Sequence, residues 1–377
     1  MATVDFELGR YADLAKTRGC RVAILGCGAI GGATVAAMLP AGFRRVTLVD
    51  CDRVEPHNCL RGFGVLSPGD VGRLKTDAFG DYILRHAPEC EVVAVNADVR
   101  DLGARFYERF DAVVCALDNT EAVLAVGEAM AGSRVPLYRA ATEGFNGSVE
   151  VVANGAADGD PCLCCHRFDA PVETRSGGCG VRYLKDVAGG HTPSVQFPTA
   201  ISANRLVMEL VKRLERPGGD VRYYDTGDEL FRFPITRDAG CPHHMTAGGV
   251  REVDLPGSVR DTTLGRLLEG RRGTALFAQS DFVVSGRCLR CGDPYPVNRP
   301  VRRLRESDMR CPVCPPGAAP DQPHEMLSTF TASQERLQGF TLYELGFRAL
   351  DRLLAEDGDG LVAFVLGGDS PETVSTR

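Results

Sequence analysis

A glycine-rich turn near the start of the chain constrains the fold more than any other stretch. It lies in RVAILGCGAIGG, where the apolar run 22–25 is followed by Gly26, Gly28 and Gly31 at the G-x-G-x-x-G spacing. This spacing converts a strand into a helix and directs backbone N–H groups and the positive end of the helix toward a phosphate. The turn therefore predicts a phosphate-binding loop at the start of an α/β fold.

The residues after the next predicted strand, 45–49, favour a triphosphate over a nicotinamide. Asp50 lies at the distance where an acidic residue takes a ribose hydroxyl in a dinucleotide fold. The chain then adds a carboxylate, an amide and two cations near the same turn, at Asp52, Asn58, Arg61 and Lys75. Cations supply charge to a triphosphate, whereas a hydride-transfer site needs little of it. These residues indicate nucleotide triphosphate chemistry.

These landmarks, continued by ALDN at 116–119, resemble the ThiF/MoeB/HesA family of adenylyltransferases, which are related to ubiquitin-activating enzymes. The resemblance covers residues 21–244 in order and spacing, and departs at Gly62, where the family usually has a glutamine. It implies an α/β fold with a Rossmann-like doubly wound mixed sheet. It also implies an enzyme that uses ATP and Mg²⁺ to adenylate a C-terminal carboxylate.

The resemblance assigns roles to individual residues. Asp118, with Asp52, would hold the magnesium ion that bridges ATP and the attacking carboxylate. Arg61 and Lys75 would stabilise the developing charge on the phosphates. Asn58 would orient the phosphates and Asp50 would bind the ribose. The turn with Gly26, Gly28 and Gly31 would contact the nucleotide through its backbone. A helix N-cap is a second interpretation of Asp118, compatible with the first.

A loop rich in Gly, Pro and charge, 170–190, carries a lone cysteine, Cys179, in SGGCG. Arg175 and Arg182 lie close to it in sequence, and positive charge favours a reactive thiolate. In the family a cysteine on this crossover loop receives the activated carrier, so the resemblance implies that Cys179 forms a thioester or acyl disulfide. Some relatives adenylate without an essential cysteine, and Cys179 would then be an incidental surface thiol.

Two pairs of soft ligands flank this loop. Cys162 and Cys165 form one pair, and Cys241 and His244 form another at the same spacing. Together they match the four ligands of a tetrahedral structural zinc, which the family carries at these two places. The alternative ligands are Cys164 and His243.

A second, independent zinc site is predicted after the linker 247–249. Two Cys-x₂-Cys pairs about 20 residues apart have the spacing of a zinc ribbon. They are Cys288, Cys291, Cys311 and Cys314. We therefore predict an adenylation domain over residues 1–246 and a C-terminal zinc-ribbon domain over 250–377, for which partner binding is one role.

Length and composition set outer limits. A chain of 377 residues is too long for one ordinary core, which favours two or three domains. No apolar run approaches the ~20 residues of a membrane span, and the charged residues 1–20 lack a signal-peptide core, so a cytoplasmic protein is expected. The net charge of −7 disfavours broad contact with nucleic acid. The 15 cysteines in a reducing compartment favour metal ligands over disulfides.

Hydrophobic patterning predicts the remaining elements. Helices are expected at 30–41, 75–85, 121–130 and 198–214, and strands at 90–96, 112–117, 135–141, 146–153, 220–232 and 233–235. The apolar face of helix 198–214 suits a dimer seam or an intramolecular core. An amphipathic stretch is predicted at 341–353, and a strand at 361–366 ends in Gly367-Gly368, where a turn is favoured over a ubiquitin-like tail.

The function that these predictions favour is activation of a ubiquitin-like or sulfur-carrier protein ending in Gly-Gly, by a homodimer. One alternative is adenylation of a ribosomal peptide or a tRNA-borne carboxylate, with the same residues and a different acceptor. A second alternative, from another class, is an NAD-dependent oxidoreductase with structural zinc. A third is a catalytically silent scaffold.

Overall fold

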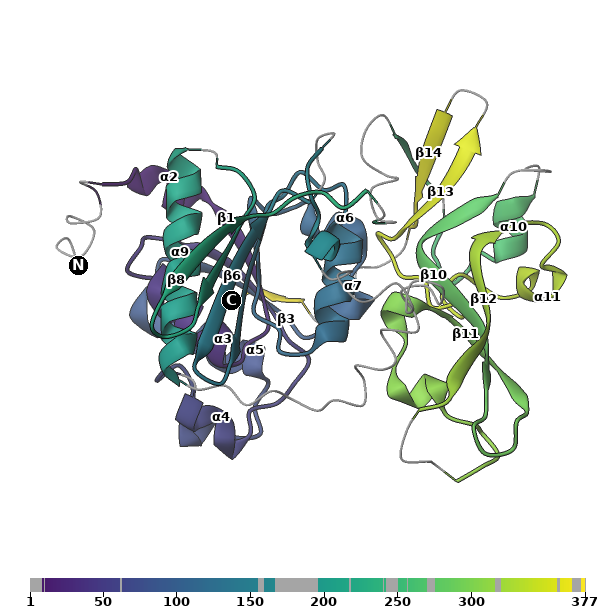
Figure 1. The fold of residues 1–377 in the computed structure, drawn as a ribbon, viewed down its shortest axis with the longest axis horizontal. Helices are drawn as coiled ribbons and strands as arrows, with labels where there is room; N and C mark the ends of the chain where they lie inside the picture. Colours follow the sequence, from purple (N-terminus) through teal and green to yellow (C-terminus); the bar gives the residue numbers. More distant parts are fainter. Residues whose placement is uncertain are drawn as a thin grey trace.

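The described residues form two bodies, shown in Figure 1. The sheet body holds a nine-stranded sheet with helices on both faces, and the second body, within residues 250–367, holds a six-stranded sheet. The computed structural model describes residues 9, 11–61, 63–154, 159–166, 196–216, 218–239, 241, 250–255, 257–269, 275–315, 320–357, 360–367 and 374–376. The proposed domain boundary at 246–250 stays a prediction.

Five neighbouring parallel strands in the order β3-β2-β1-β4-β5 form the centre of the large sheet. They are β1 (Arg21–Leu25), β2 (Arg45–Val49), β3 (Glu91–Val95), β4 (Ala112–Cys115) and β5 (Leu137–Glu143). Side chains alternate across the sheet, so Val22 and Ile24 join one core while Ala23 and Leu25 join the other. Burial on both faces explains why these strands are nearly continuous apolar runs. The predicted doubly wound α/β fold is confirmed.

Helices cover both faces of this sheet. They are α2 (Leu14–Gly19), α3 (Ala29–Met38), α4 (Pro56–Arg61), α5 (Lys75–His86), α6 (Ala104–Tyr107), α7 (Thr120–Met130) and α9 (Gln196–Glu215). Side chains of α3, α5 and α9 pack in one core, and those of α6 and α7 pack in the other. Helix α3 ends at Met38, before the predicted Ala41, and the chain turns at Gly42, whose φ is +90°.

The apolar face of α9 belongs to the intramolecular core. Ala203, Leu206 and Leu210 on this face are fully buried against the sheet and α3. Of the two interpretations that the sequence left open for this face, the structure supports core packing. Among the described residues, no helix has the length and apolar composition needed to cross a membrane.

Antiparallel strands extend the sheet at both sides. They are β6 (Asn146–Val152), β7 (Val221–Asp225), β8 (Leu230–Pro234) and β15 (Val374–Thr376). β6 pairs antiparallel with β5, as predicted, but β7 and β8 continue beyond it. The prediction of one strand over 220–232 was wrong, because a turn at Gly227, with φ of +87°, separates β7 from β8. Pairing of β15 with β3 was not predicted.

The second body packs around its own apolar core. Its sheet has the order β11-β10-β13-β14-β9, and β12 also pairs with β10. Its elements are β9 (Arg251–Asp254), α10 (Leu264–Leu268), β10 (Leu276–Arg287), β11 (Pro294–Pro300), β12 (Gln322–Phe330), α11 (Glu335–Gln338), β13 (Arg352–Asp357) and β14 (Gly360–Val365). The rings of Phe282, Phe330 and Phe347 meet in this core, with centroids 5.0–6.2 Å apart.

The strand predicted at 361–366 is β14, and the turn predicted after it stays a prediction, because Gly368 lies outside the described residues. The N–H of Val259 donates to the carbonyl oxygen of Gly367 at 3.0 Å, and a Cβ on Gly367 would lie 2.3 Å from the oxygen of Gly257. This glycine is therefore part of the packed body and not part of a free ubiquitin-like tail. The amphipathic stretch 341–353 consists of turns with buried Leu342 and Leu345, and β13 begins at Arg352.

Candidate active site

Three of the predicted site segments meet at one edge of the sheet. Strand β1 lies between β2 and β4, and Leu25 pairs with both Val49 and Cys115. The carboxyl ends of the three strands are therefore level, and they lead into the glycine turn, Asp50 and the loop with Asp118. Open α/β sheets bind ligands at this edge, where the strand order reverses.

The three glycines of the turn have different surroundings. Gly26 has a φ of +99°, and a Cβ there would lie 2.7 Å from the oxygen of Ala116. A Cβ on Gly31 would lie 2.1 Å from the oxygen of Gly26, whereas a Cβ on Gly28 would meet nothing within 4 Å. Gly28 is the N-cap of α3 and makes no side-chain cap bond. The open space at the helix N-terminus suits a phosphate.

Asp50 anchors the glycine turn to the end of β2. Its Oδ2 accepts a hydrogen bond from the N–H of Cys27 at 2.7 Å, and its Oδ1 accepts one from the N–H of Asp52 at 2.8 Å. Burial raises the pKa of the Asp50 carboxyl, although Lys75 and the two N–H donors oppose that shift. The sequence predicted a ribose contact for Asp50, and its anchoring role was missed because it depends on bonds that form only after folding.

Lys75 points into the same site from the first residue of α5. Its Nζ lies 2.9 Å from Oδ2 of Asp52, and its side chain is only 12% exposed. Burial works to lower the pKa of Lys75, but the Asp50 and Asp52 carboxylates outweigh burial and raise it. The carboxylates of Asp50 and Asp52 and the thiol of Cys51 lie within 4.8 Å of one another. The edge therefore offers both a fixed cation for phosphates and oxygen ligands for a divalent ion.

The next two predicted residues lie on α4. Asn58 closes the first turn of this helix, because its Oδ1 accepts the N–H of Glu55 at 2.8 Å and its Nδ2 contacts Nε2 of His57 at 3.0 Å. Arg61 is the last residue of α4, and its side chain and Gly62 lie outside what the structure describes. The predicted phosphate contacts of Asn58 and Arg61 stay predictions.

The N-cap interpretation of Asp118 is wrong. The N-cap of α7 is Asn119, whose Oδ1 accepts the N–H of Ala122 at 2.7 Å. Asp118 lies one residue earlier, with an exposed side chain at the carboxyl end of β4. The predicted magnesium contact of Asp118 stays a prediction.

Three of the four ligands predicted for the first zinc site come together. The Sγ of Cys162 lies 3.8 Å from that of Cys165 and 3.7 Å from that of Cys241, although Cys241 is distant in sequence. Cys164 lies against α7 instead, since a Cβ on Gly127 would be 3.0 Å from its Sγ. Cys165 is therefore the better ligand of the two alternatives. His243, His244 and Cys179 lie outside the described residues.

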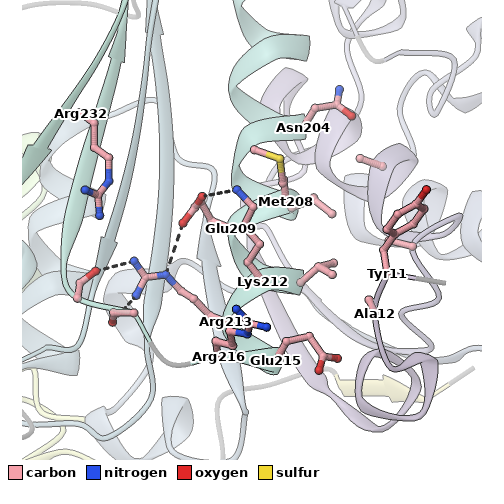
Figure 2. Close-up of a pocket in the computed structure, with 16 residues that line it drawn as sticks. Tyr11, Ala12, Asn204, Met208, Glu209, Lys212, Arg213, Glu215, Arg216 and Arg232 are labelled. Atoms are coloured by element: carbon pink, nitrogen blue, oxygen red, sulfur yellow. Dashed lines mark hydrogen bonds and ion pairs between the residues drawn. The ribbon is translucent and has the colours of Figure 1, made fainter. Parts of the chain in front are cut away.

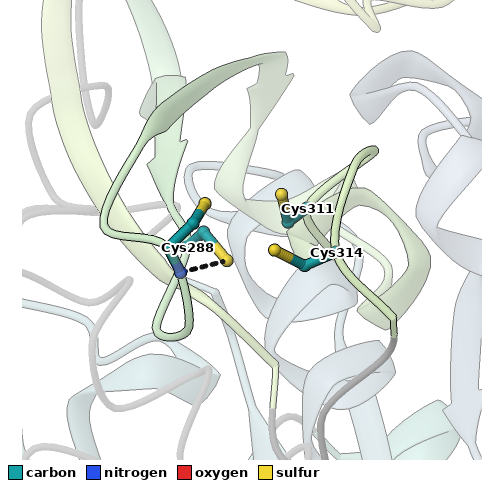
Figure 3. A group of neighbouring side chains, drawn as sticks. Cys288, Cys311 and Cys314 are labelled. Atoms are coloured by element: carbon teal, nitrogen blue, oxygen red, sulfur yellow. Dashed lines mark hydrogen bonds between the residues drawn. The ribbon is translucent and has the colours of Figure 1, made fainter.

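The four cysteines of the second predicted zinc site also form a cluster. The thiols of Cys288, Cys291, Cys311 and Cys314 all lie within 4.8 Å of one another. Figure 3 shows the side chains of Cys311 and Cys314 facing Cys288. Hydrogen bonds from the N–H groups of Cys291 and Arg290 lower the pKa of Cys288 to about 7. Four soft donors with one readily ionised thiol suit a tetrahedral zinc ion.

A cavity of about 830 Å³ lies elsewhere, beside α2, α3, α9 and β8, and is shown in Figure 2. Its lining includes four cations, Lys212, Arg213, Arg216 and Arg232. Glu209 neutralises part of this charge, with Lys212 at 3.5 Å and Arg213 at 3.8 Å. None of the residues predicted for the nucleotide or the metals lines this cavity.

Solved structures share the fold of this chain. A crystal structure of E. coli MccB with MccA-N7isoASN matches with a TM-score of 0.51 and 18% identity, covering 61% of this chain and 68% of that one. The microcin C7 biosynthetic enzyme MccB in complex with N-formylated MccA matches with a TM-score of 0.50 and 19% identity, covering 61% and 69%.

Two curated relatives match the chain over shorter stretches. The SUMO-activating enzyme subunit 2 of Dictyostelium discoideum is 25% identical over 160 residues, 42% of this chain and 24% of the relative. The Nedd8-activating enzyme E1 catalytic subunit of Drosophila melanogaster is 29% identical over 149 residues, 36% and 33%. The chain thus spans about a quarter to a third of the length of these relatives. The ThiF family model matches residues 3–242, well over half of the 377 residues, and the chain therefore belongs to the ThiF family.

Proposed function

We propose that this protein is an adenylyltransferase that activates the C-terminal carboxylate of a ubiquitin-like or sulfur-carrier protein. The observation that carries the proposal is the meeting of four features at one sheet edge. These are the open N-terminus of α3, the buried cation Lys75, the carboxylate of Asp52 and the exposed carboxylate of Asp118. A hydride-transfer site has no use for this combination of charges, which argues against an NAD-dependent oxidoreductase.

The chemistry makes a poor electrophile reactive. An oxygen of the carrier's terminal carboxylate attacks the α-phosphorus of ATP, the bond to the bridging oxygen breaks, and pyrophosphate leaves with its electron pair. The product is an acyl adenylate. Lys75 neutralises negative charge that moves onto the phosphates, and Arg61 is proposed to assist it. Asp118 and Asp52 would hold Mg²⁺, which supplies further charge neutralisation when bound.

A second step would use Cys179. The thiolate attacks the acyl carbon of the adenylate, a thioester forms, and AMP leaves. Two zinc ions are proposed as structural elements, one held by Cys162, Cys165, Cys241 and His244 and the other by the four cysteines of the second body. The soft thiol donors that the structure brings together support both sites.

Dimerisation is proposed through the outer strand β8. Its side chains Leu230, Phe231 and Phe233 are 50%, 38% and 49% exposed, and Tyr224 on β7 adds to the same edge. An edge strand with exposed apolar side chains is an aggregation hazard unless another chain covers it. A second copy of this protein would cover it.

The central test is carrier-dependent exchange of pyrophosphate into ATP. We expect exchange with a carrier protein ending in Gly-Gly, and we expect Asp118→Ala to abolish it. Asp111→Ala is the matched control, because Asp111 lies at the opposite end of β4 and pairs with Arg21 at 2.8 Å. Undiminished exchange by Asp118→Ala would remove Asp118 from the site. Exchange driven by a ribosomal peptide instead would favour that substrate class, and binding of NAD in place of ATP would refute adenylation.

The thioester step has its own test. Cys179→Ala is expected to retain exchange and to lose the reductant-sensitive adduct between enzyme and carrier. An adduct that persists in this variant would exclude Cys179 as the acceptor. Asp118→Ala should lack both exchange and adduct, which separates the two steps.

A further inference from the structure

A network of alternating charges joins the two bodies beside the candidate active site. Three carboxylates and one arginine come from the sheet body, and two arginines come from the second body. They are Asp98, Asp101, Glu121 and Arg100 in the first, and Arg305 and Arg348 in the second. Figure 1 shows α7 between the large sheet and the second body, where this junction lies.

Arg100 connects the segment that follows β3 to the first turn of α7. It lies in the short 3₁₀-helix η2 (Val99–Asp101), and its Nη2 donates to Oδ2 of Asp98 at 2.6 Å. Its Nη1 donates to Oε2 of Glu121 at 3.1 Å. Glu121 is in the first turn of α7, three residues after Asp118. The three side chains are only 14–18% exposed, so solvent screens these pairs weakly.

The second body holds this bridge in place. Arg305 lies 2.9 Å from a carboxylate oxygen of Asp101 and 3.6 Å from one of Asp98, and Arg348 lies 3.4 Å from Asp101. Arg303 donates from Nε to the carbonyl oxygen of Arg100 at 2.6 Å. Arg303 belongs to η7 (Val301–Arg303), so the main chain and the side chains of η2 are both held.

The arginines of η7 are themselves fixed in the second body. Arg302 and Arg303 are almost completely buried, and both pair with Asp351, which has no exposed surface. Two cations sharing one buried carboxylate require a defined geometry, because the desolvation cost is offset only when the hydrogen bonds are made. The second body therefore presents a rigid surface to η2.

We propose that Arg100 and Arg305 are positioning residues for Asp118, through which the second body tunes the affinity of the nucleotide site for Mg²⁺. The inference rests on the proposed function, because it assigns Asp118 to the cation. The loop of Asp118 is short and is fixed on one side by β4 and on the other by α7, whose first turn Arg100 holds. A displacement of about an ångström at such a position is enough to weaken the binding of a metal ion by the Asp118 carboxylate.

The experiment compares Arg305→Gln with Arg352→Gln in the full chain. Arg352 comes from the same body and pairs with Glu108 and Glu252, away from Asp98 and Asp101. We expect Arg305→Gln to speed hydrogen–deuterium exchange in residues 116–123 and to raise the Mg²⁺ concentration for half-maximal pyrophosphate exchange about fivefold. The exchange rate at saturating Mg²⁺ should not change. Arg305→Lys keeps the positive charge and should behave nearly like the parent protein in both measurements.

Two outcomes would overturn the inference. One is deuterium exchange in 116–123 that is the same in Arg305→Gln and in the parent protein. The other is an equal change in Arg352→Gln, which would reflect general loosening of the junction. If the parent protein shows no pyrophosphate exchange, the proposed function fails, and the deuterium measurement still decides whether Arg305 holds the loop.

Discussion

At the scale of single residues, the glycine turn shows how one spacing serves three purposes. Gly26 is required by its left-handed backbone, with φ of +99°, and by the closeness of Ala116. Gly31 is required by helix packing, because its Cα faces the carbonyl oxygen of Gly26. Gly28 meets neither constraint, so its lack of a side chain serves whatever occupies the open space at the N-terminus of α3.

This difference gives a matched pair of variants. Gly31→Ala should unfold at lower temperature than the parent protein, since overpacking of this kind costs about 1–3 kcal/mol. Gly28→Ala should keep the parent melting temperature and lose affinity for ATP, because its methyl group takes the space of a phosphate. Thermal melting and ATP titration check the two parts. Normal ATP binding by Gly28→Ala would show that the phosphates lie elsewhere.

At the scale of elements, prediction succeeded where local sequence decides the structure. The β-branched run 45–49 forms β2 with the predicted bounds, and the helix predicted at 75–85 is α5. Prediction failed in the hairpin of β7 and β8, because a single strand was predicted through Gly227, where the chain turns. Likewise, Cys-x₂-Cys spacing identified both cysteine clusters. The junction was not predictable, because Arg305 and Asp101 are 204 residues apart in sequence.

The proposed dimer edge is an element whose role is testable. Phe233→Asp places a charge on β8 and should convert the dimer to a monomer in light scattering after gel filtration. Val313→Asp is the control, since Val313 is an 86% exposed apolar residue of the second body. A dimer that survives Phe233→Asp would place the interface on another surface.

At the scale of the whole molecule, arginines of the second body meet carboxylates of the sheet body. Burial favours a raised pKa for Asp98 of the sheet body and for Asp351 inside the second body. Hydrogen bonds and charge from Arg100 at Asp98, and from Arg302 and Arg303 at Asp351, outweigh burial and lower both pKa values. A carboxyl whose folded pKa is lowered stabilises the folded state above its ordinary pKa of about 3.9. That stabilisation is lost as the pH falls through the lowered value.

Acid should therefore weaken the ion pairs of Asp98 at the junction and of Asp351 inside the second body. The melting temperature is expected to fall steeply from about pH 4 downward, and Asp351→Asn should flatten this dependence. At pH 7 the free energy of unfolding of the same variant should be about 3–5 kcal/mol lower than that of the parent protein, because two buried arginines are left without their carboxylate. Glu91→Gln is the control, since its pair with Arg45 at 3.3 Å is exposed and is worth less than about 1 kcal/mol. Equal losses in both variants would contradict this account.

Strand β15 has a consequence for how the protein is made. Val374 pairs with Val95, so within the described part of the chain the outer side of β3 is paired by residues that follow the whole second body. During synthesis on the ribosome, the N–H and C=O groups on this side of β3 lack the partners that β15 supplies until residues 374–376 emerge. An exposed strand edge of this kind pairs readily with strands of other chains. A protein cut after β14 would expose it permanently.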